Sequence, residues 1–207
     1  NDFVIKPVLE EGLISRIRSL LLIKQQFTQL RQQSEDMRRM ANIDSLTGVY
    51  NKRYLVGHAD ALVANPRNQP LWVALLDLDH FKSVNDRYGH LTGDRVLQGV
   101  ADLMKYYFRL HDIIARIGGE EFVVVLLRRT RQECLSEIEE LRRRIEALQP
   151  AGFPVTASIG LSTNLNRPQA VFNQLSFEAD QAMYLAKQNG RNQVRLWDET
   201  PAQAGLC

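Results

Sequence analysis

The chain has 207 residues, of which 44% are hydrophobic and 24% charged, a composition that excludes disordered and collagen-like proteins. Its 26 Lys and Arg residues nearly balance 24 Asp and Glu residues, so overall charge predicts no nucleic-acid partner and no membrane partner. No apolar run approaches the roughly 18 residues that span a bilayer, and two cysteines are too few for a disulfide scaffold, so we expect a cytoplasmic protein. The chain does not begin with Met, so we expect a fragment or a processed form.

The N-terminal region contains a predicted long helix. Residues 3–5 are apolar and precede Lys6 and Pro7, which predicts the end of a strand and a turn. Apolar residues then recur at helical spacing over residues 12–41, which predicts a helix about 45 Å long. This helix either packs on its own domain or, as we favour, pairs with a second copy as a parallel coiled coil. Its a/d seam has seven positions, of which one is polar: Leu20, Ile23, Phe27, Leu30, Ser34, Met37 and Ala41.

The rest of the chain alternates predicted helices and strands. Helices are predicted at residues 51–65, 81–88, 93–108, 131–148 and 169–189. Strands are predicted at residues 71–77, 112–117, 121–127, 155–162 and 194–197. The second and third strands flank a Gly-Gly turn and should form a hairpin. This order predicts an α+β or α/β domain with one core.

Acidic residues lie at two predicted strand ends. Asp77 and Asp79 end an apolar strand, and Glu120 and Glu121 follow the glycines of the hairpin turn. Crowded carboxylates repel one another unless a cation is present, and oxygen ligands favour Mg²⁺ or Mn²⁺. Asp77 with either glutamate would form half of such a site. Asp79 is better explained as the cap of the next helix, and an acidic two-glycine hairpin alone is weak evidence.

Other polar residues suit an anionic, guanine-containing ligand. Lys187 and Arg191 lie four residues apart near a predicted helix end, where they could bind phosphate or simply complement the helix dipole. Asn85 and Asp94 flank a turn that contains His90. An amide and a carboxylate can pair with the guanine edge, although both residues are also common in caps and turns.

Together these residues resemble GGDEF-domain diguanylate cyclases over about residues 42–197. The resemblance implies an α+β fold, an α/β sandwich with a palm-like mixed sheet and flanking helices, related to class III nucleotide cyclases. It also implies condensation of two GTP molecules into cyclic di-GMP with release of two pyrophosphates. The motifs that support it are Asp44-Ser-Leu-Thr47, Asp77-Leu-Asp-His-Phe-Lys82, Asn85, Gly89-His90, Gly93-Asp94, Arg116-Ile-Gly-Gly-Glu-Glu-Phe122, Ala157-Ser-Ile-Gly160, Ala179-Asp-Gln-Ala-Met-Tyr184, Lys187 and Gly190-Arg-Asn192.

The resemblance assigns metal and catalytic roles around the hairpin turn. Asp77 and Glu120 would hold Mg²⁺ or Mn²⁺ ions, two per site, with help from the backbone carbonyl of Leu78. Glu121 would be an additional or second-metal ligand. Glu120 would accept the proton of the 3′-hydroxyl, unless the metal alone lowers the pKa of that hydroxyl and water takes the proton.

The resemblance also assigns the substrate contacts. Asn85 and Asp94 would bind guanine, and His90 would line the ribose and base region. Gly119 would let the substrate approach the backbone of the turn. Lys187 and Arg191 would bind the terminal phosphates.

Each such site holds one GTP, so two domains must face each other, and a coiled-coil homodimer would raise their effective concentration.

Arg109 and Asp112 have the spacing of the family's inhibitory site for cyclic di-GMP, although a surface salt bridge is the alternative. Some members place a further arginine on the next helix. This chain has Glu140 there, with Arg142, Arg143 and Arg144 close behind, which puts that secondary contact in doubt.

Residues 2–7 and 13–20 resemble the last strand and helix of a response-regulator receiver domain, in which Lys6 would contact a phosphorylated aspartate. The phosphoacceptor strand is absent, so we expect that a longer parent protein contains a receiver upstream. The expected organisation is a receiver remnant at residues 1–22, a coiled-coil linker at 20–41, a catalytic domain at 42–198 and a flexible tail at 199–207.

Two other functions are compatible with the motifs. A catalytically inactive receptor would bind cyclic di-GMP through Arg109 and Asp112, but inactive members usually lose the acidic turn or the strand-end aspartate, and both are intact here. An enzyme that makes a mixed adenine-guanine dinucleotide would differ at Asp94, because a carboxylate repels an adenine edge that lacks N1–H.

Overall fold

The computed structural model describes residues 7–167 and 169–197. Residues 1–41 and 42–207 form two compact units, which are described separately. The first unit contains helix α1 (Pro7–Asn42), which confirms the predicted helix and begins earlier than expected. The expected strand end and Lys6, and the expected tail at 199–207, lie outside the described residues.

Helix α1 exposes the predicted seam. Leu20, Ile23, Phe27, Leu30 and Met37 are 60% to 71% exposed in the single chain. Within the described part of the first unit, α1 has no second element against which these side chains could pack. The described helices include none that is long and apolar enough to cross a membrane.

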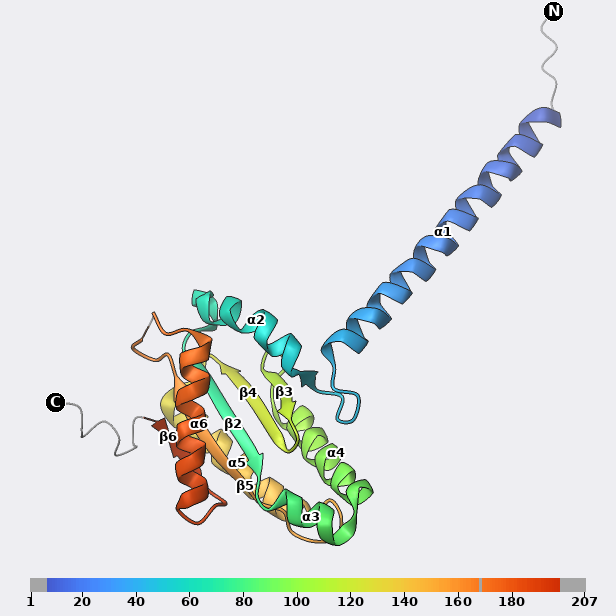
Figure 1. The fold of residues 1–207 in the computed structure, drawn as a ribbon. Helices are drawn as coiled ribbons and strands as arrows, with labels where there is room; N and C mark the ends of the chain where they lie inside the picture. The colour runs from blue at the N-terminus through green and yellow to red at the C-terminus, as the bar shows by residue number, and fades with distance from the viewer. Residues whose placement is uncertain (1–6, 168, 198–207) are drawn as a thin grey trace, which may run out of the picture. The chain divides into compact units, whose positions relative to one another are not determined.

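The second unit is built on one mixed sheet of six strands in the order β1-β3-β4-β2-β5-β6 (Figure 1). The strands are β1 (Tyr50–Asn51), β2 (Leu71–Leu78), β3 (Ile113–Gly118), β4 (Glu121–Leu127), β5 (Ala157–Thr163) and β6 (Val194–Leu196). The hairpin of β3 and β4 confirms the predicted one, and the antiparallel pairs of β2 with β4 and β5 place β2 at the centre. All eight residues of β2 are buried, which explains its continuous apolar sequence.

Helices cover both faces of the sheet (Figure 1). They are α2 (Lys52–Ala64), α3 (Phe81–Tyr88), α4 (His90–Tyr107), α5 (Arg131–Leu148) and α6 (Phe172–Gln188), and a short 3₁₀ helix spans Pro66–Asn68. Alternate residues of β2 divide between two cores, because successive strand side chains point to opposite faces. Trp72, Ala74 and Leu76 pack with α4 and α5, and Leu71, Val73 and Leu75 pack with α2 and α6.

The predicted fold class is confirmed: helices flank a mixed sheet in an α+β domain. The prediction missed β1 and the 3₁₀ helix, and it began the helix at residue 93, whereas α4 begins at His90. Gly160 of β5 allows α6 to approach the sheet closely, because a Cβ there would lie 1.9 Å from the Ala179 carbonyl oxygen. Helix α6 is thereby held against β5 and β2, where its C-terminal end reaches the candidate site.

Candidate active site

Three carboxylates gather where β2 and the hairpin turn end. Asp77 is the direct neighbour of Glu121 in the antiparallel pairing of β2 with β4. The Leu78 N–H donates to the Glu120 carbonyl at 3.4 Å, so the turn folds back onto the end of β2. Asp77 is buried, whereas Glu120 and Glu121 are half-buried. The structure therefore brings together the predicted acidic residues.

Electrostatics at Asp77 favour a nearby cation. Burial raises the pKa of Asp77, the charges of Glu120 and Glu121 raise it further, and Lys187 opposes the rise. The Lys187 Nζ atom lies 2.8 Å from Asp77 Oδ2, so the end of α6 supplies a positive charge to the site. A site that leaves a carboxylate hard to ionise gains most when a positive charge is added.

The donor set fits a hard divalent cation in an open site. Asp77, Glu120 and Glu121 offer only oxygen ligands, as Mg²⁺ and Mn²⁺ prefer. Within the described residues, no group of three His, Cys, Asp or Glu side chains is arranged to hold a metal by itself. Mg²⁺ typically uses one or two protein carboxylates together with substrate phosphates. The residues therefore fit a metal that binds with its substrate.

Arg116 holds the hairpin turn in place. Its Nε and Nη2 atoms donate to the Gly119 carbonyl at 2.9 and 2.7 Å, and its Nη1 atom donates to Asp44 Oδ1 at 3.1 Å. Although burial opposes it, hydrogen bonds from Thr47 and Arg116 lower the pKa of Asp44 and keep it charged. A Cβ at Gly119 would meet nothing within 4 Å, so the turn is open to a ligand. The contacts of Arg116 were not predicted from the sequence, because Asp44 lies 72 residues away along the chain.

The predicted guanine-binding residues lie at the junction of α3 and α4. Gly89 separates the two helices with a φ of 82°, and its N–H donates to the Asn85 carbonyl at 2.8 Å. A Cβ at Gly93 would lie 2.0 Å from Asn85 Oδ1, so only glycine lets the Asn85 amide rest against the residue that precedes Asp94. His90 begins α4 and is exposed. The structure thus places Asn85 of α3 against the first turns of α4, the helix that contains Asp94.

The predicted phosphate-binding residues lie at the end of α6. Lys187 is in the last turn of the helix, and Arg191 is exposed on the turn that follows. The Arg191 N–H donates to the Ala186 carbonyl at 3.0 Å. Since Lys187 contacts Asp77, this end of α6 adjoins the carboxylates.

The expected capping role of Asp79 is wrong. The cap position of α3 is His80, which makes no side-chain cap hydrogen bond. Asp79 is instead buried and accepts from Thr156 Oγ1 at 2.7 Å, from Ser158 Oγ at 2.7 Å and from the Asn192 N–H at 3.1 Å. These donors come from residues distant in sequence, which is why a local cap pattern did not reveal them.

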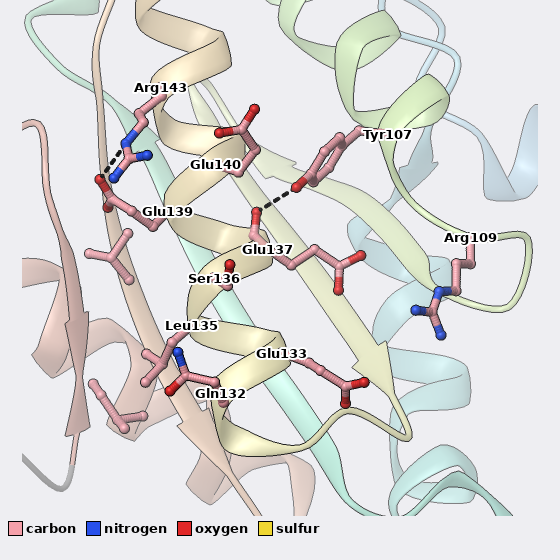
Figure 2. Close-up of a pocket in the computed structure, with 12 residues that line it drawn as sticks. Tyr107, Arg109, Gln132, Glu133, Leu135, Ser136, Glu137, Glu139, Glu140 and Arg143 are labelled. Atoms are coloured by element: carbon pink, nitrogen blue, oxygen red, sulfur yellow. Dashed lines mark hydrogen bonds and ion pairs between the residues drawn. The ribbon is translucent and has the colours of Figure 1, made fainter.

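A pocket of about 780 Å³ lies beside the predicted inhibitory residues (Figure 2). Arg109 lines one side, while α5 contributes Glu133, Glu137 and Arg143 among others. Glu140 also lines the pocket. The arginine that α5 presents here is therefore Arg143, together with Arg109 from the turn before β3.

Asp112 is not among the residues that line this pocket. Its side chain is 0% exposed, and its two oxygens accept from Arg129 Nη1 at 2.9 Å and Nη2 at 2.6 Å. They also accept from the Arg109 N–H at 3.0 Å and the Leu127 N–H at 3.3 Å. A carboxylate has about four acceptor positions, so internal donors use them all. The surface ion pair with Arg109, which was the alternative interpretation, is not the pair that Asp112 forms; its carboxylate pairs with the buried Arg129.

Comparison with known proteins places this geometry in a family. Residues 41–193 match the family model described as "Diguanylate cyclase, GGDEF domain". Diguanylate cyclase DosC of Escherichia coli K12 is 34% identical over 192 residues, which are 88% of this chain and 42% of DosC. Response regulator PleD of Caulobacter vibrioides is 32% identical over 210 residues, which are 94% of this chain and 44% of PleD. The chain thus spans less than half the length of these relatives.

A solved structure extends the similarity to the fold. The coiled coil and GGDEF domain of DgcB from Caulobacter crescentus, in complex with cyclic di-GMP, matches with a TM-score of 0.79. The two are 28% identical, and the match covers 88% of this chain and 99% of that one.

Proposed function

The chain belongs to the GGDEF family of diguanylate cyclases, and from this premise we propose that it condenses two GTP molecules into cyclic di-GMP and releases two pyrophosphates. The main support is the meeting of Asp77, Glu120 and Glu121 with Lys187, 2.8 Å from Asp77, at one end of the sheet. Phosphoryl transfer depends mostly on positioning and charge neutralisation, and this cluster provides carboxylates for metal and a cation for phosphate.

Asp77 and Glu120, with the Leu78 carbonyl and Glu121, would hold two Mg²⁺ or Mn²⁺ ions. When bound, the ions supply positive charge that neutralises the triphosphate. Lys187 and Arg191 then bind the terminal phosphates. Because Arg116 fixes the turn through the Gly119 carbonyl, the substrate meets a backbone that is already positioned.

Guanine would be bound where α3 meets α4. The Asp94 carboxylate accepts the N–H groups of the base, and the Asn85 amide can both donate and accept. His90 lines the ribose and base region. Glu120 accepts the proton from the 3′-hydroxyl, with Glu121 beside it. This set of base contacts favours GTP over ATP, whose adenine lacks N1–H.

The reaction needs two domains, because each 3′-hydroxyl attacks the nucleotide held by the other. We propose a homodimer formed through α1, whose seam residues Leu20, Ile23, Phe27 and Leu30 are exposed in the single chain. The similarity to a chain described as the coiled coil and GGDEF domain of DgcB supports this arrangement. Pairing would bury these side chains and keep two sites within reach of each other.

We also propose inhibition by cyclic di-GMP at the pocket in Figure 2. Arg109 and Arg143 line it and could bind the product's phosphates or guanine edges. Asp112 would act by fixing the Arg109 backbone, at 3.0 Å, and not by contacting the ligand. The DgcB structure in complex with cyclic di-GMP is a precedent for product binding by a related chain.

The upstream residues support a further proposal about the parent protein. The similarity to PleD, named a response regulator, covers 94% of this chain. We propose that residues 1–22 derive from a receiver domain, so that phosphorylation upstream regulates the cyclase.

Incubation with GTP and Mg²⁺, followed by chromatography of the products, tests the proposed function. The unaltered chain should form cyclic di-GMP and pyrophosphate, at a rate per protein that rises with protein concentration. Glu120→Ala should abolish synthesis and keep the fold, because it removes one of several crowded carboxylates and no core residue. Binding of cyclic di-GMP without any synthesis by the parent would instead identify a receptor, and full activity of Glu120→Ala would reject the catalytic assignment.

A further inference from the structure

The turn that contains Arg191 has an unusual backbone. Gly190, Arg191 and Asn192 have φ values of 104°, 61° and 46°, so three consecutive residues are left-handed. Residues with a side chain rarely adopt this conformation, and two of them in a row persist only where the surroundings hold them. The stability of this turn therefore depends on contacts made by its neighbours.

Asn192 makes those contacts with its backbone and with both ends of its amide. Its N–H donates to Asp79 Oδ2 at 3.1 Å, next to the end of β2. Its Oδ1 accepts from Arg142 Nη1 at 2.6 Å, and its Nδ2 donates to Glu146 Oε1 at 3.0 Å. The amide therefore lies between two charged side chains one turn apart on α5.

The partners of Asn192 are themselves fixed. Arg142 Nη1 also donates to Glu146 Oε2 at 3.0 Å. The Nε and Nη2 atoms of Arg142 donate to Glu139 Oε1 at 3.1 and 2.8 Å. Glu139 also pairs with Arg143 at 3.4 Å, as Figure 2 shows at the wall of the pocket. The Arg142 guanidinium is thus oriented before it reaches the turn.

From this geometry we propose that Arg142 and Glu146 are positioning residues that hold Arg191 for the substrate's terminal phosphates by gripping the Asn192 amide. The inference rests on the proposed function, which assigns those phosphates to Arg191. Arg142 and Glu146 touch no reacting atom. They act because Asn192 directly follows Arg191, so fixing one residue of a left-handed pair fixes the backbone from which the other extends.

The test compares a nucleotide that has the terminal phosphates assigned to Arg191 with one that lacks them. Calorimetric titration with GMP and with guanosine 5′-(α,β-methylene)triphosphate plus Mg²⁺ measures each affinity without turnover. Arg142→Ala should weaken the affinity for the triphosphate about tenfold, since it removes the hydrogen bond between the charged Arg142 and the Asn192 amide. It should leave GMP affinity unchanged. In an Arg191→Ala background the same substitution should add nothing, because its effect passes through Arg191.

Two further variants separate positioning from folding. Asn192→Gly tolerates the positive φ, keeps the α5 ion pairs and removes only the amide, so it should reproduce the loss seen with Arg142→Ala. Arg144→Ala is the matched control: Arg144 pairs with Glu140 at 2.9 Å on the same helix and should leave both affinities unchanged.

Three results would overturn the positioning role. One is unchanged triphosphate affinity in Arg142→Ala and Asn192→Gly, and another is an equal loss of GMP affinity in these variants. The third is that Arg142→Ala lowers triphosphate affinity just as much in the Arg191→Ala background. A different pattern would reject the proposed function. If the parent fails to bind the triphosphate, or Arg191→Ala binds it normally, the phosphate role of Arg191 is wrong, and the positioning role fails with it.

Discussion

Breaking the buried ion pair between Arg129 and Asp112 should cause a large loss in the free energy of unfolding. Arg129 is 2% exposed, and besides its two bonds to Asp112 it donates to the Leu127 carbonyl at 2.7 Å and to both oxygens of Glu137. Although burial opposes it, hydrogen bonds to Glu137 and Asp112 raise the pKa of Arg129, so its charge persists across the accessible pH range. The pair holds β4, α5 and the turn before β3 together.

Arg129→Met keeps the apolar stem and removes these bonds. Glu137 is 18% exposed on its side chain and can turn to water, whereas the Asp112 side chain is 0% exposed and cannot. Removal of one partner of a buried pair costs about 3–5 kcal/mol, which corresponds to about 6–20 °C in Tm for a domain of this size. Most of this cost comes from the Asp112 carboxylate, which stays buried without its cationic partner.

Urea unfolding followed by circular dichroism measures the loss. Adding Asp112→Asn should recover part of the stability at neutral pH. As the control, Arg144→Ala breaks an exposed pair and should cost at most about 1 kcal/mol. A loss in Arg129→Met as small as that of the control, or no recovery on adding Asp112→Asn, would refute the reasoning.

Three other predictions test the site, the dimer and the inhibitory pocket. Asp77→Asn should lose activity yet have a higher Tm at neutral pH, because burial raises the pKa of Asp77 and the folded state therefore favours its neutral form. The gain in Tm should vanish as the pH falls through that raised pKa. An unchanged or lower Tm of Asp77→Asn at neutral pH contradicts this prediction. Phe27→Glu with Leu30→Glu places like charges in the α1 seam and should yield monomers by sedimentation, with activity that falls at low protein concentration; a mutant of unchanged mass would show that α1 does not dimerise through this seam. Arg109→Ala should weaken cyclic di-GMP binding in calorimetry and relieve product inhibition without lowering the initial rate, whereas equal affinity would leave the pocket without an inhibitory role.

The elements of the fold were predictable where local patterns determine them. Helix α5 (Arg131–Leu148) has the predicted bounds, since Thr130 and Glu133 form a capping box at its start and Pro150 follows its end. The strand β2 followed from its uninterrupted apolar sequence. The two residues of β1 were missed because their pairing with β3 depends on residues far along the chain. Strand pairing of this kind leaves no local periodicity.

The candidate site shows the same division. Asp77, Glu120 and Glu121 could be placed together because each ends a strand or follows a tight turn. The partners of Asp112 could not be inferred from its spacing to Arg109, because Arg129 lies beyond the next two strands, β3 and β4. The donors that a buried carboxylate binds depend on tertiary contacts, so a motif can place a residue in the chain without showing its partners.

Asp79 and Asn192 show how such hidden contacts join the site to its support. The local pattern assigned Asp79 to a helix cap, but its carboxylate binds two hydroxyls of the β5 region and the Asn192 N–H. The end of β2 therefore touches, through one side chain, the turn that contains Arg191. The same strand end contains Asp77, so the metal-binding and phosphate-binding parts of the proposed site both contact the end of β2. A cyclase that aligns two triphosphates depends on such contacts, because misplacement of reacting groups by about 1 Å can cost about a hundredfold in rate.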